Sequence, residues 1–269
     1  MVKSSAMLRA VAILAVLTPL FAEQSALTLE QKEEFLRNAK IIRTRSAKKG
    51  VTNTVRVTLS DGTLTHDASV QRIDEEKARF EGARGTEMNF RDSYKFNIAA
   101  YRLARLLGIA HMVPPSVERR YEGGTAAWTW WIDDVQIDEG ERIRQKKESP
   151  DKDGWARQYH IMRIFDQLIA NTDRNMQNIL YDKGWHLWMI DHTRAFRVHT
   201  QVMEKQFLTR CDAQLLAYMK MMPEDKLRTE VGPWLRDREI TGLLKRRDSI
   251  VKYFEKGDPK KLYQFLSEQ

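Results

Sequence analysis

Residues 168–196, LIANTDRNMQNILYDKGWHLWMIDHTRAF, constrain the fold of this chain more than any other segment. Two short apolar runs, NILYD and WHLWMID, flank a DKG sequence that is typical of a turn, so the segment predicts a β-hairpin. Because a hairpin returns the chain to its own start, Asp191 at its end is expected to lie near Asn178 at its beginning. Asp173 stands just before the hairpin, in a loop that leaves a long predicted helix.

Asp173, Asn178 and Asp191 would then bring three oxygen-bearing side chains to one end of a two-stranded ribbon. One or two carboxylates, an amide oxygen and water are the ligands that Mg²⁺ takes when it also binds substrate phosphates. Each of the three residues alone can equally be a turn, cap or strand-end residue. The three together, at this spacing, favour a site for a metal ion and phosphates.

The N-terminal residues have the pattern of an export signal. Lys3 and Arg9 accompany the apolar run AVAILAVLTPLFA, which is too short to span a membrane as a mature helix, and small residues at Ala22 and Ala26 offer cleavage points. A buried N-terminal helix is the alternative. We expect residues 1–22 to be a signal peptide and the protein to be exported, to a periplasm or to the extracellular space. No transmembrane segment is then expected after leader cleavage.

The overall composition describes a globular protein with a basic surface. Of the 269 residues, 42% are hydrophobic and 30% charged, and the mean hydropathy of -0.56 excludes a membrane bundle. Loss of Lys3 and Arg9 with the leader lowers the formal net charge from +8 to +6, which favours anionic partners. Nucleic acid is not expected among them, because no motif of interleaved aromatic and basic residues accompanies the charge. The single cysteine, Cys211, excludes an internal disulfide.

Hydrophobic patterning divides the remaining chain into two parts. Residues 27–38 predict a helix, residues 51–74 a hairpin, residues 75–91 a loop or irregular link, and residues 91–108 a helix that Asp92 or Ser93 caps and Gly108 ends. Two strands around a Gly-Gly turn, a charged linker over 138–154, a helix over 155–171, the hairpin and a helical C-terminal third follow. The chain therefore predicts an α+β fold, with a β-rich part at 27–135, a helical part at 155–269 and a ligand cleft between them.

The hairpin segment also resembles a known family. DRNMQN at 173–178, followed by a hairpin and IDH at 190–192, is similar to the catalytic and metal-binding loops of the atypical kinases. These include the phosphatidylinositol 3- and 4-kinases, the HipA-type toxin kinases and the secreted Golgi casein kinases. The segment FNIAAYRLARLLGIAHMVPPSVERR resembles the helix-then-strand region of the last two groups. The resemblance covers residues 50–200 and implies a two-lobed protein-kinase-like fold, with a β-rich N-lobe and a helical C-lobe.

For the catalytic segment, the resemblance implies a role for each residue that matches the pattern. Asp173 would be the catalytic base or would orient the acceptor hydroxyl, and Asn178 and Asp191 would hold Mg²⁺ or Mn²⁺ on the phosphates of ATP. Arg174 would contact phosphate or hold the loop, with a purely structural ion pair as the alternative. His192, which follows the metal-binding aspartate where kinases have Phe, would pack beside the ligands without being one of them.

Two further segments match parts of a nucleotide site. TAAWTWWID is expected to enter the hinge between the lobes, where the face of Trp131 could hold adenine, and ordinary strand packing is the alternative for its tryptophans. SAKKGVTNT would be the turn that covers the phosphates, with Lys48, Lys49 and Gly50 at its tip.

Two positions depart from the kinase pattern. Gln71 stands where the resemblance implies a lysine that grips the α- and β-phosphates, and Asn97 stands where it implies the glutamate that pairs with that lysine. Both charges are lost together, as in a rewired pair, because the loss of one alone would leave an uncompensated buried charge. Two amides can still form a hydrogen bond, but they supply no cation. Either another cation, such as Lys48, Lys49 or Arg72, would then hold the phosphates, or the protein would bind nucleotide poorly and catalyse little.

Two functions are compatible with these residues. The leading prediction is an exported kinase that uses ATP and Mg²⁺ or Mn²⁺ to phosphorylate a hydroxyl of an unidentified protein or small-molecule acceptor. The alternative is an exported pseudokinase that acts as a nucleotide-binding or scaffolding module.

Overall fold

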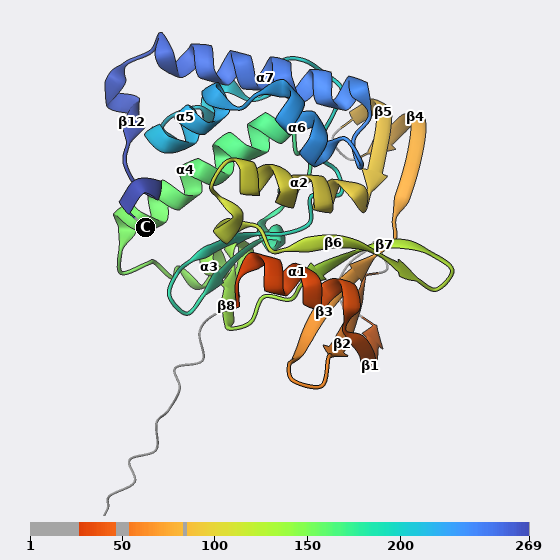
Figure 1. Cartoon of the computed structure of the whole chain (residues 1–269). Helices are drawn as coiled ribbons and strands as arrows, with labels where there is room; N and C mark the ends of the chain where they lie inside the picture. The colour runs from red at the N-terminus through yellow and green to blue at the C-terminus, as the bar shows by residue number, and fades with distance from the viewer. Residues whose placement is uncertain (1–26, 47–53, 83–84, 269) are drawn as a thin grey trace, which may run out of the picture.

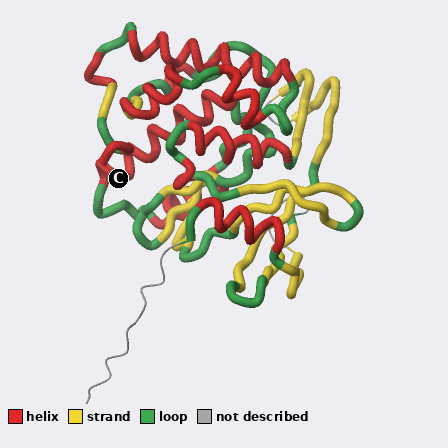
Figure 2. Tube along the Cα trace, viewed as in Figure 1, coloured by secondary structure: helices red, strands yellow, loops and turns green. Residues whose placement is uncertain are grey.

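A β-rich lobe and a helical lobe lie against each other in the computed structural model, which describes residues 27–46, 54–82 and 85–268 (Figure 1). Helices dominate one side of the molecule and strands the other (Figure 2). The predicted α+β, two-lobed arrangement is therefore confirmed. The expected signal peptide and the segment with Lys48, Lys49 and Gly50 lie outside the described residues.

The N-lobe is built on a five-stranded antiparallel sheet with the order β1-β2-β3-β7-β6. Its strands are β1 (Lys40–Ser46), β2 (Val55–Ser60), β3 (Thr65–Gln71), β6 (Ser116–Tyr121) and β7 (Gly124–Trp130). Helix α1 (Leu29–Asn38) begins with a capping box at Thr28. One core joins the helix to the sheet, because alternate strand residues point to the same face; it includes Phe35, Leu36, Val57, Leu59, Val70 and Trp128.

A separate ribbon of two strands, β4 (Asp74–Gly82) and β5 (Gly85–Ser93), stands beside the helical lobe (Figure 1). The expectation of a loop over residues 75–91 is therefore wrong. Most of these side chains are exposed, so the strands lack the alternation of apolar and polar residues that marks a half-buried strand. Asp92 and Ser93 end β5, and Tyr94 precedes the next helix without a side-chain cap. Of the two predicted capping residues, Ser93 accepts a hydrogen bond through its Oγ from the backbone N–H of Lys95, the first residue of that helix (3.4 Å).

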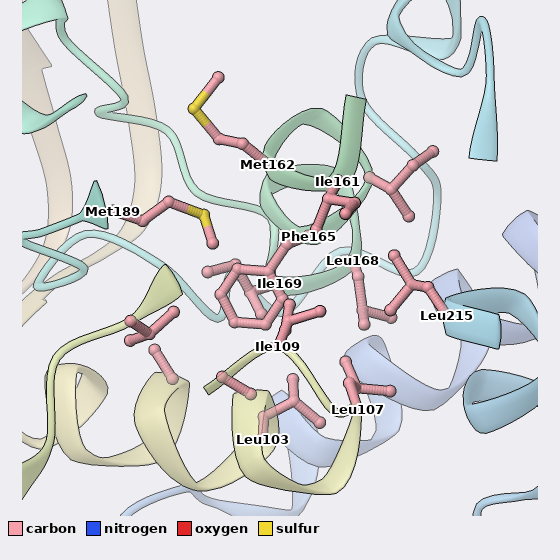
Figure 3. Close-up of a cluster of buried hydrophobic side chains, with 14 of the residues drawn as sticks. Leu103, Leu107, Ile109, Ile161, Met162, Phe165, Leu168, Ile169, Met189 and Leu215 are labelled. Atoms are coloured by element: carbon pink, nitrogen blue, oxygen red, sulfur yellow. The ribbon is translucent and has the colours of Figure 1, made fainter. Parts of the chain in front are cut away.

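Helix α2 (Lys95–Leu106) connects the two lobes. It ends before Gly108, whose φ of +70° is a conformation that glycine adopts without strain. Beyond its contacts with β6 and β7, its apolar face meets the long helix α4 (Lys152–Ile169) in the largest core of the protein. Figure 3 shows these side chains interlocking, among them Leu103, Leu107, Ile109, Ile161, Phe165, Leu168 and Ile169.

Within the described residues, the C-lobe combines this core with a small sheet and four further helices. The sheet has the order β10-β9-β8, with β8 at Val135–Asp138, β9 at Ile179–Asp182 and β10 at Leu187–Met189. Helix α3 (Glu139–Gln145) occupies part of the expected linker, so that stretch is ordered structure. The last third is helical as predicted, with α5 (Ala213–Met221), α6 (Glu224–Val231) and α7 (Asp237–Glu255).

Short elements complete the lobe. Strands β11 (Cys211–Asp212) and β12 (Leu262–Tyr263) form a parallel pair. Five 3₁₀ turns lie at Ala110–Met112, Met176–Asn178, Lys205–Phe207, Pro259–Lys261 and Leu266–Glu268 within the described ranges. Among the helices of those ranges, none is long and apolar enough to cross a membrane.

Candidate functional site

Asp173 lies in a tight loop that follows α4. Its backbone N–H donates to the side-chain oxygen of Asn171 (3.1 Å), and its carbonyl accepts hydrogen bonds from the N–H of Asn175 (2.8 Å) and the side chain of Asn178 (3.4 Å). These bonds fix the backbone and do not involve the carboxylate, which has a long ion pair with Arg194 (3.9 Å) while 40% of the side chain is exposed. Asp173 is therefore rigidly placed and open to a ligand.

The hairpin brings Asp191 and Asn178 to the same place. Met189 pairs with Ile179 across the two strands, and the N–H of Ile190 donates to the carbonyl of Asn178 (3.1 Å). Asp191 follows directly and has a φ of +53°, a left-handed conformation that costs a non-glycine residue about 1 to 3 kcal/mol. Strain of this kind persists where the surrounding structure enforces it, and here the closing hydrogen bond of the hairpin does so.

Arg174 holds this loop in place through a buried ion pair. Its guanidinium lies 3.0 Å from the carboxylate of Asp166 on α4, and both side chains are only 4% exposed. The same guanidinium donates to the carbonyls of Asn178 (3.1 Å) and Ile190 (2.7 Å), one on each side of the hairpin. These contacts match the structural alternative for Arg174. The role of Asp166 was not predicted. The one feature of the sequence that could have indicated it is an acidic residue among the apolar positions of a helix.

Gln71 and Asn97 form the amide pair that their positions suggested. The Asn97 amide donates to the Gln71 side-chain oxygen (2.5 Å), and its own oxygen accepts from the backbone N–H of His192 (2.7 Å). Gln71 also donates to Thr54 (3.3 Å), and the two amides are 7% and 6% exposed. The pair thus links β3 and α2 to the residue next to Asp191, and it does so without charge.

His192 is a packing residue in this arrangement. It is 2% exposed, and its ring meets that of Phe165 edge to face, with the ring centroids 6.0 Å apart. Burial, and then the positive charge of Arg174, hold the pKa of His192 well below its usual value, so the imidazole is neutral.

The remaining predicted nucleotide contacts are only partly described. An Arg56 guanidinium lies over the ring of Trp131, 4.0 Å from its centroid, so one face of that ring is already covered. Trp128 and Trp130 belong to the N-lobe core. Arg72, one of the candidate phosphate cations, forms an ion pair with Glu122 (3.3 Å).

A cavity of about 1150 Å³ opens beside Asp173, between the β4–β5 ribbon and the loops of the C-lobe. Its walls combine apolar side chains with cations, among them Phe80, Met88, Arg163, Arg194, Arg197 and Phe207. Arg194 reaches from the wall toward Glu87 (3.0 Å) and Asp173 (3.9 Å). A third of this lining comes from a ribbon that was predicted to be a loop, so the sequence did not reveal it.

Burial shifts the pKa of Arg197, which lines the cavity, and of Asp92 near the end of β5. Burial lowers the pKa of Arg197, against the opposing effect of Glu87. The pKa of Asp92 is raised, first by burial and then by the negative charge of Asp191. Hydrogen bonding by Thr193 opposes this rise. Asp92 therefore lies close to the proposed metal ligand Asp191, although the sequence offered it only as a helix cap.

Comparison with known proteins identifies the fold. No protein-family model matches the chain, and no curated protein does. A hydra Fam20 solved with sugar matches with a TM-score of 0.65 and 16% identity, over 88% of this chain and 92% of that one. A Golgi casein kinase matches with a TM-score of 0.58 and 13% identity, over 87% and 77%. The chain has the fold of the atypical kinases. A Helicobacter pylori proinflammatory kinase, CtkA, matches at a TM-score of 0.46 and 11% identity, over 80% and 92%.

Within the atypical-kinase fold, the donor set around Asp191 fits Mg²⁺ or Mn²⁺. The Asp191 carboxylate and the Asn178 amide supply hard oxygen ligands, and such ions complete their coordination with water and nucleotide phosphates. Among the described residues, no group of three or more His, Cys, Asp or Glu side chains gathers into a metal site.

Proposed function

We propose that this chain is an exported atypical kinase that transfers a phosphoryl group from ATP, with Mg²⁺ or Mn²⁺, to a hydroxyl of a protein or small-molecule acceptor. The convergence of Asp173, Asn178 and Asp191 at one end of a hairpin, within an atypical-kinase fold, is the observation that carries this proposal. The metal, when bound, neutralises charge on the transferring phosphate.

Each residue acts through its place in the site. Asn178, where the hairpin begins, and Asp191, where it finishes, would hold the metal together, and Asp173 would accept a hydrogen bond from the acceptor hydroxyl and align it for transfer. Arg174 and Asp166 do not touch the reacting groups. Their buried pair keeps the loop and the hairpin at a fixed separation, which such alignment requires.

The acceptor is expected to enter through the cavity, because the exposed carboxylate of Asp173 lines it. The relatives support a hydroxyl acceptor in general terms: one was solved with a sugar, and another is named as a casein kinase. Sugar hydroxyls and protein side-chain hydroxyls are both compatible with a cavity whose wall combines Phe80 and Phe207 with Arg163.

A pseudokinase is the second candidate, and one observation favours it. The Gln71–Asn97 pair is neutral, buried and fully formed, so it supplies none of the positive charge that the phosphates need. The segment with Lys48 and Lys49, which could supply that charge, lies outside the described residues.

The first prediction tests the metal and nucleotide site by thermal unfolding. ATP with Mg²⁺ or Mn²⁺ should stabilise the mature protein, by about 2.7 kcal/mol at a ligand concentration 100 times the Kd. Asp191→Ala should abolish the metal-dependent part of this gain and leave the fold intact, whereas Asp153→Ala, an exposed aspartate on the first turn of α4, should behave like the wild type. An unchanged response of Asp191→Ala would mean that Asp191 is structural. Phosphate release and autophosphorylation assays then distinguish enzyme from pseudokinase.

The second prediction concerns export. If residues 1–22 or 1–26 are a leader, mass spectrometry of the protein expressed in a secreting host should find a mature N-terminus at Glu23 or Leu27, in an exported fraction. Intact Met1 recovered from the cytosol would contradict the export proposal.

A further inference from the structure

Asp92 is a buried carboxylate that the proposed mechanism does not use. It lies near the end of β5, where the next residue, Ser93, donates its backbone N–H to the carbonyl of Thr193 (2.9 Å). The residue is 8% exposed, and its Oδ1 atom is buried without a hydrogen-bond partner. Since an unpaired buried carboxylate oxygen is costly, this atom calls for a partner.

Asp92 and Asp191 share a single hydrogen-bond donor. The Thr193 hydroxyl donates to the Asp191 Oδ1 (3.1 Å), and the carbonyl of the same threonine accepts from Ser93, the neighbour of Asp92 (2.9 Å). Burial raises the pKa of Asp92, and hydrogen bonding by the Thr193 hydroxyl opposes that effect. A hydroxyl carries only one hydrogen, so it can satisfy only one of the two carboxylates at a time. The two negative charges are also close enough to repel each other. Among the described residues, no cationic side chain donates a hydrogen bond to the Asp92 Oδ1.

Two arginines lie near this pair, and the hydrogen bonds that they form go elsewhere, while the Nε atoms of both are buried without a hydrogen-bond partner. Arg197 pairs with Glu87 (2.8 Å) and donates to the carbonyl of Arg91 and the hydroxyl of Thr172. Arg194 donates to Glu87 (3.0 Å). Both attract Asp92 at longer range without occupying its free oxygen.

Asp92 also faces the same short loop as the Gln71–Asn97 pair. Asn97 binds the backbone N–H of His192, and Ser93, beside Asp92, binds the carbonyl of Thr193. The loop that follows Asp191 is thus held by α2 at His192 and by β5 at Thr193. With both amides neutral, Asp92 carries the negative charge that the β5 side brings to this loop.

We propose that Asp92 is a second carboxylate ligand of the metal ion that Asp191 and Asn178 hold. This inference rests on the proposed function, because it places Asp92 on the metal of that site. Two carboxylates and an amide oxygen, with water and phosphates, form a donor set that Mg²⁺ and Mn²⁺ accept. The ion would meet the unpartnered oxygen of Asp92 and would separate the two carboxylates.

Binding of Mn²⁺ without nucleotide tests the proposal, measured by electron paramagnetic resonance of free Mn²⁺ on the mature protein. Asp92→Asn should weaken Mn²⁺ binding by about 10- to 100-fold, as Asp191→Asn should. Asp74→Asn is the matched control: it lies on the same ribbon, bonds to Lys95 (2.9 Å) and Ser93 (2.7 Å), and should leave Mn²⁺ affinity unchanged. The relaxation rate of water protons on bound Mn²⁺ should rise in Asp92→Asn, because water fills the freed coordination position.

The outcomes separate this proposal from the proposed function. If Asp191→Asn loses Mn²⁺ and Asp92→Asn keeps it, with at most a lower Tm, Asp92 is a structural residue and the kinase site stands. If neither variant changes Mn²⁺ binding, the metal site itself is wrong. Should Asp92→Asn not fold, Thr193→Val gives a second test. Removal of the shared donor should make the gain in Tm on adding Mn²⁺ larger than in the wild type, and an equal gain would overturn the role of Asp92.

Discussion

Asp173→Ala is expected to lower the rate of phosphoryl transfer by about 10²- to 10⁴-fold while barely changing the affinity for ATP. The Asp173 carboxylate accepts no hydrogen bond within its own loop and opens into the cavity, so its removal takes away little that stabilises the fold. Its proposed partner is the acceptor hydroxyl, which is aligned only on the way to the transition state. An interaction of that kind affects turnover and leaves ground-state binding of the nucleotide unchanged.

The measurement pairs a turnover assay with calorimetric titration of ATP and Mg²⁺. Asp153→Ala, an exposed aspartate outside the cavity, is the control for loss of an aspartate and should keep full activity. Turnover that survives Asp173→Ala would defeat the mechanism, because the group that carries the chemistry would then lie elsewhere. A parallel loss of ATP affinity would instead place Asp173 in the nucleotide site.

The hairpin part of this site could be predicted because its geometry depends on residues that are close together in the sequence. A turn between two apolar runs makes a hairpin, and a hairpin necessarily returns Asp191 to Asn178. The pairing of Gln71 with Asn97 was foreseeable only through the resemblance to kinases. No periodicity brings together two residues that are 26 positions apart on a strand and a helix.

The parts that were missed depend on long-range contacts or on exposed strands. The β4–β5 ribbon buries little of either face, so its sequence carries no alternation, and the cavity wall that it forms was missed with it. Asp166 pairs with Arg174 eight residues later, a contact that no local pattern marks, and Ser93, beside Asp92, bonds to Thr193 a hundred residues further along the chain. A carboxylate on a helix face or at a strand end has the same local sequence whether it is buried against a partner or exposed to water.

Restoring the charges of the kinase pattern is expected to lower the free energy of unfolding strongly in each single variant and much less in the double variant. Gln71→Lys alone or Asn97→Glu alone would leave one uncompensated charge at positions that are 7% and 6% exposed, and each should destabilise the protein by about 3 to 5 kcal/mol. The double variant should recover most of that loss, because the new side chains can pair as the amides now do. Urea unfolding of the wild type and the three variants measures this coupling directly.

The nucleotide affinity of the double variant then distinguishes an enzyme from a pseudokinase. A lysine at position 71 adds a charged hydrogen bond to the phosphates, worth about 1.5 to 3 kcal/mol, or roughly tenfold or more in the Kd for ATP. A pseudokinase that lacks any phosphate cation should show the whole gain, and some turnover with it. A working kinase whose phosphates are already held by another cation, such as Lys48 or Lys49, should gain little.

If the double variant stays as unstable as the single ones, the Gln71–Asn97 pair does not occupy the position of the kinase ion pair. The main role of Asn97 would then be to accept the hydrogen bond from His192 and so to hold the loop that follows Asp191.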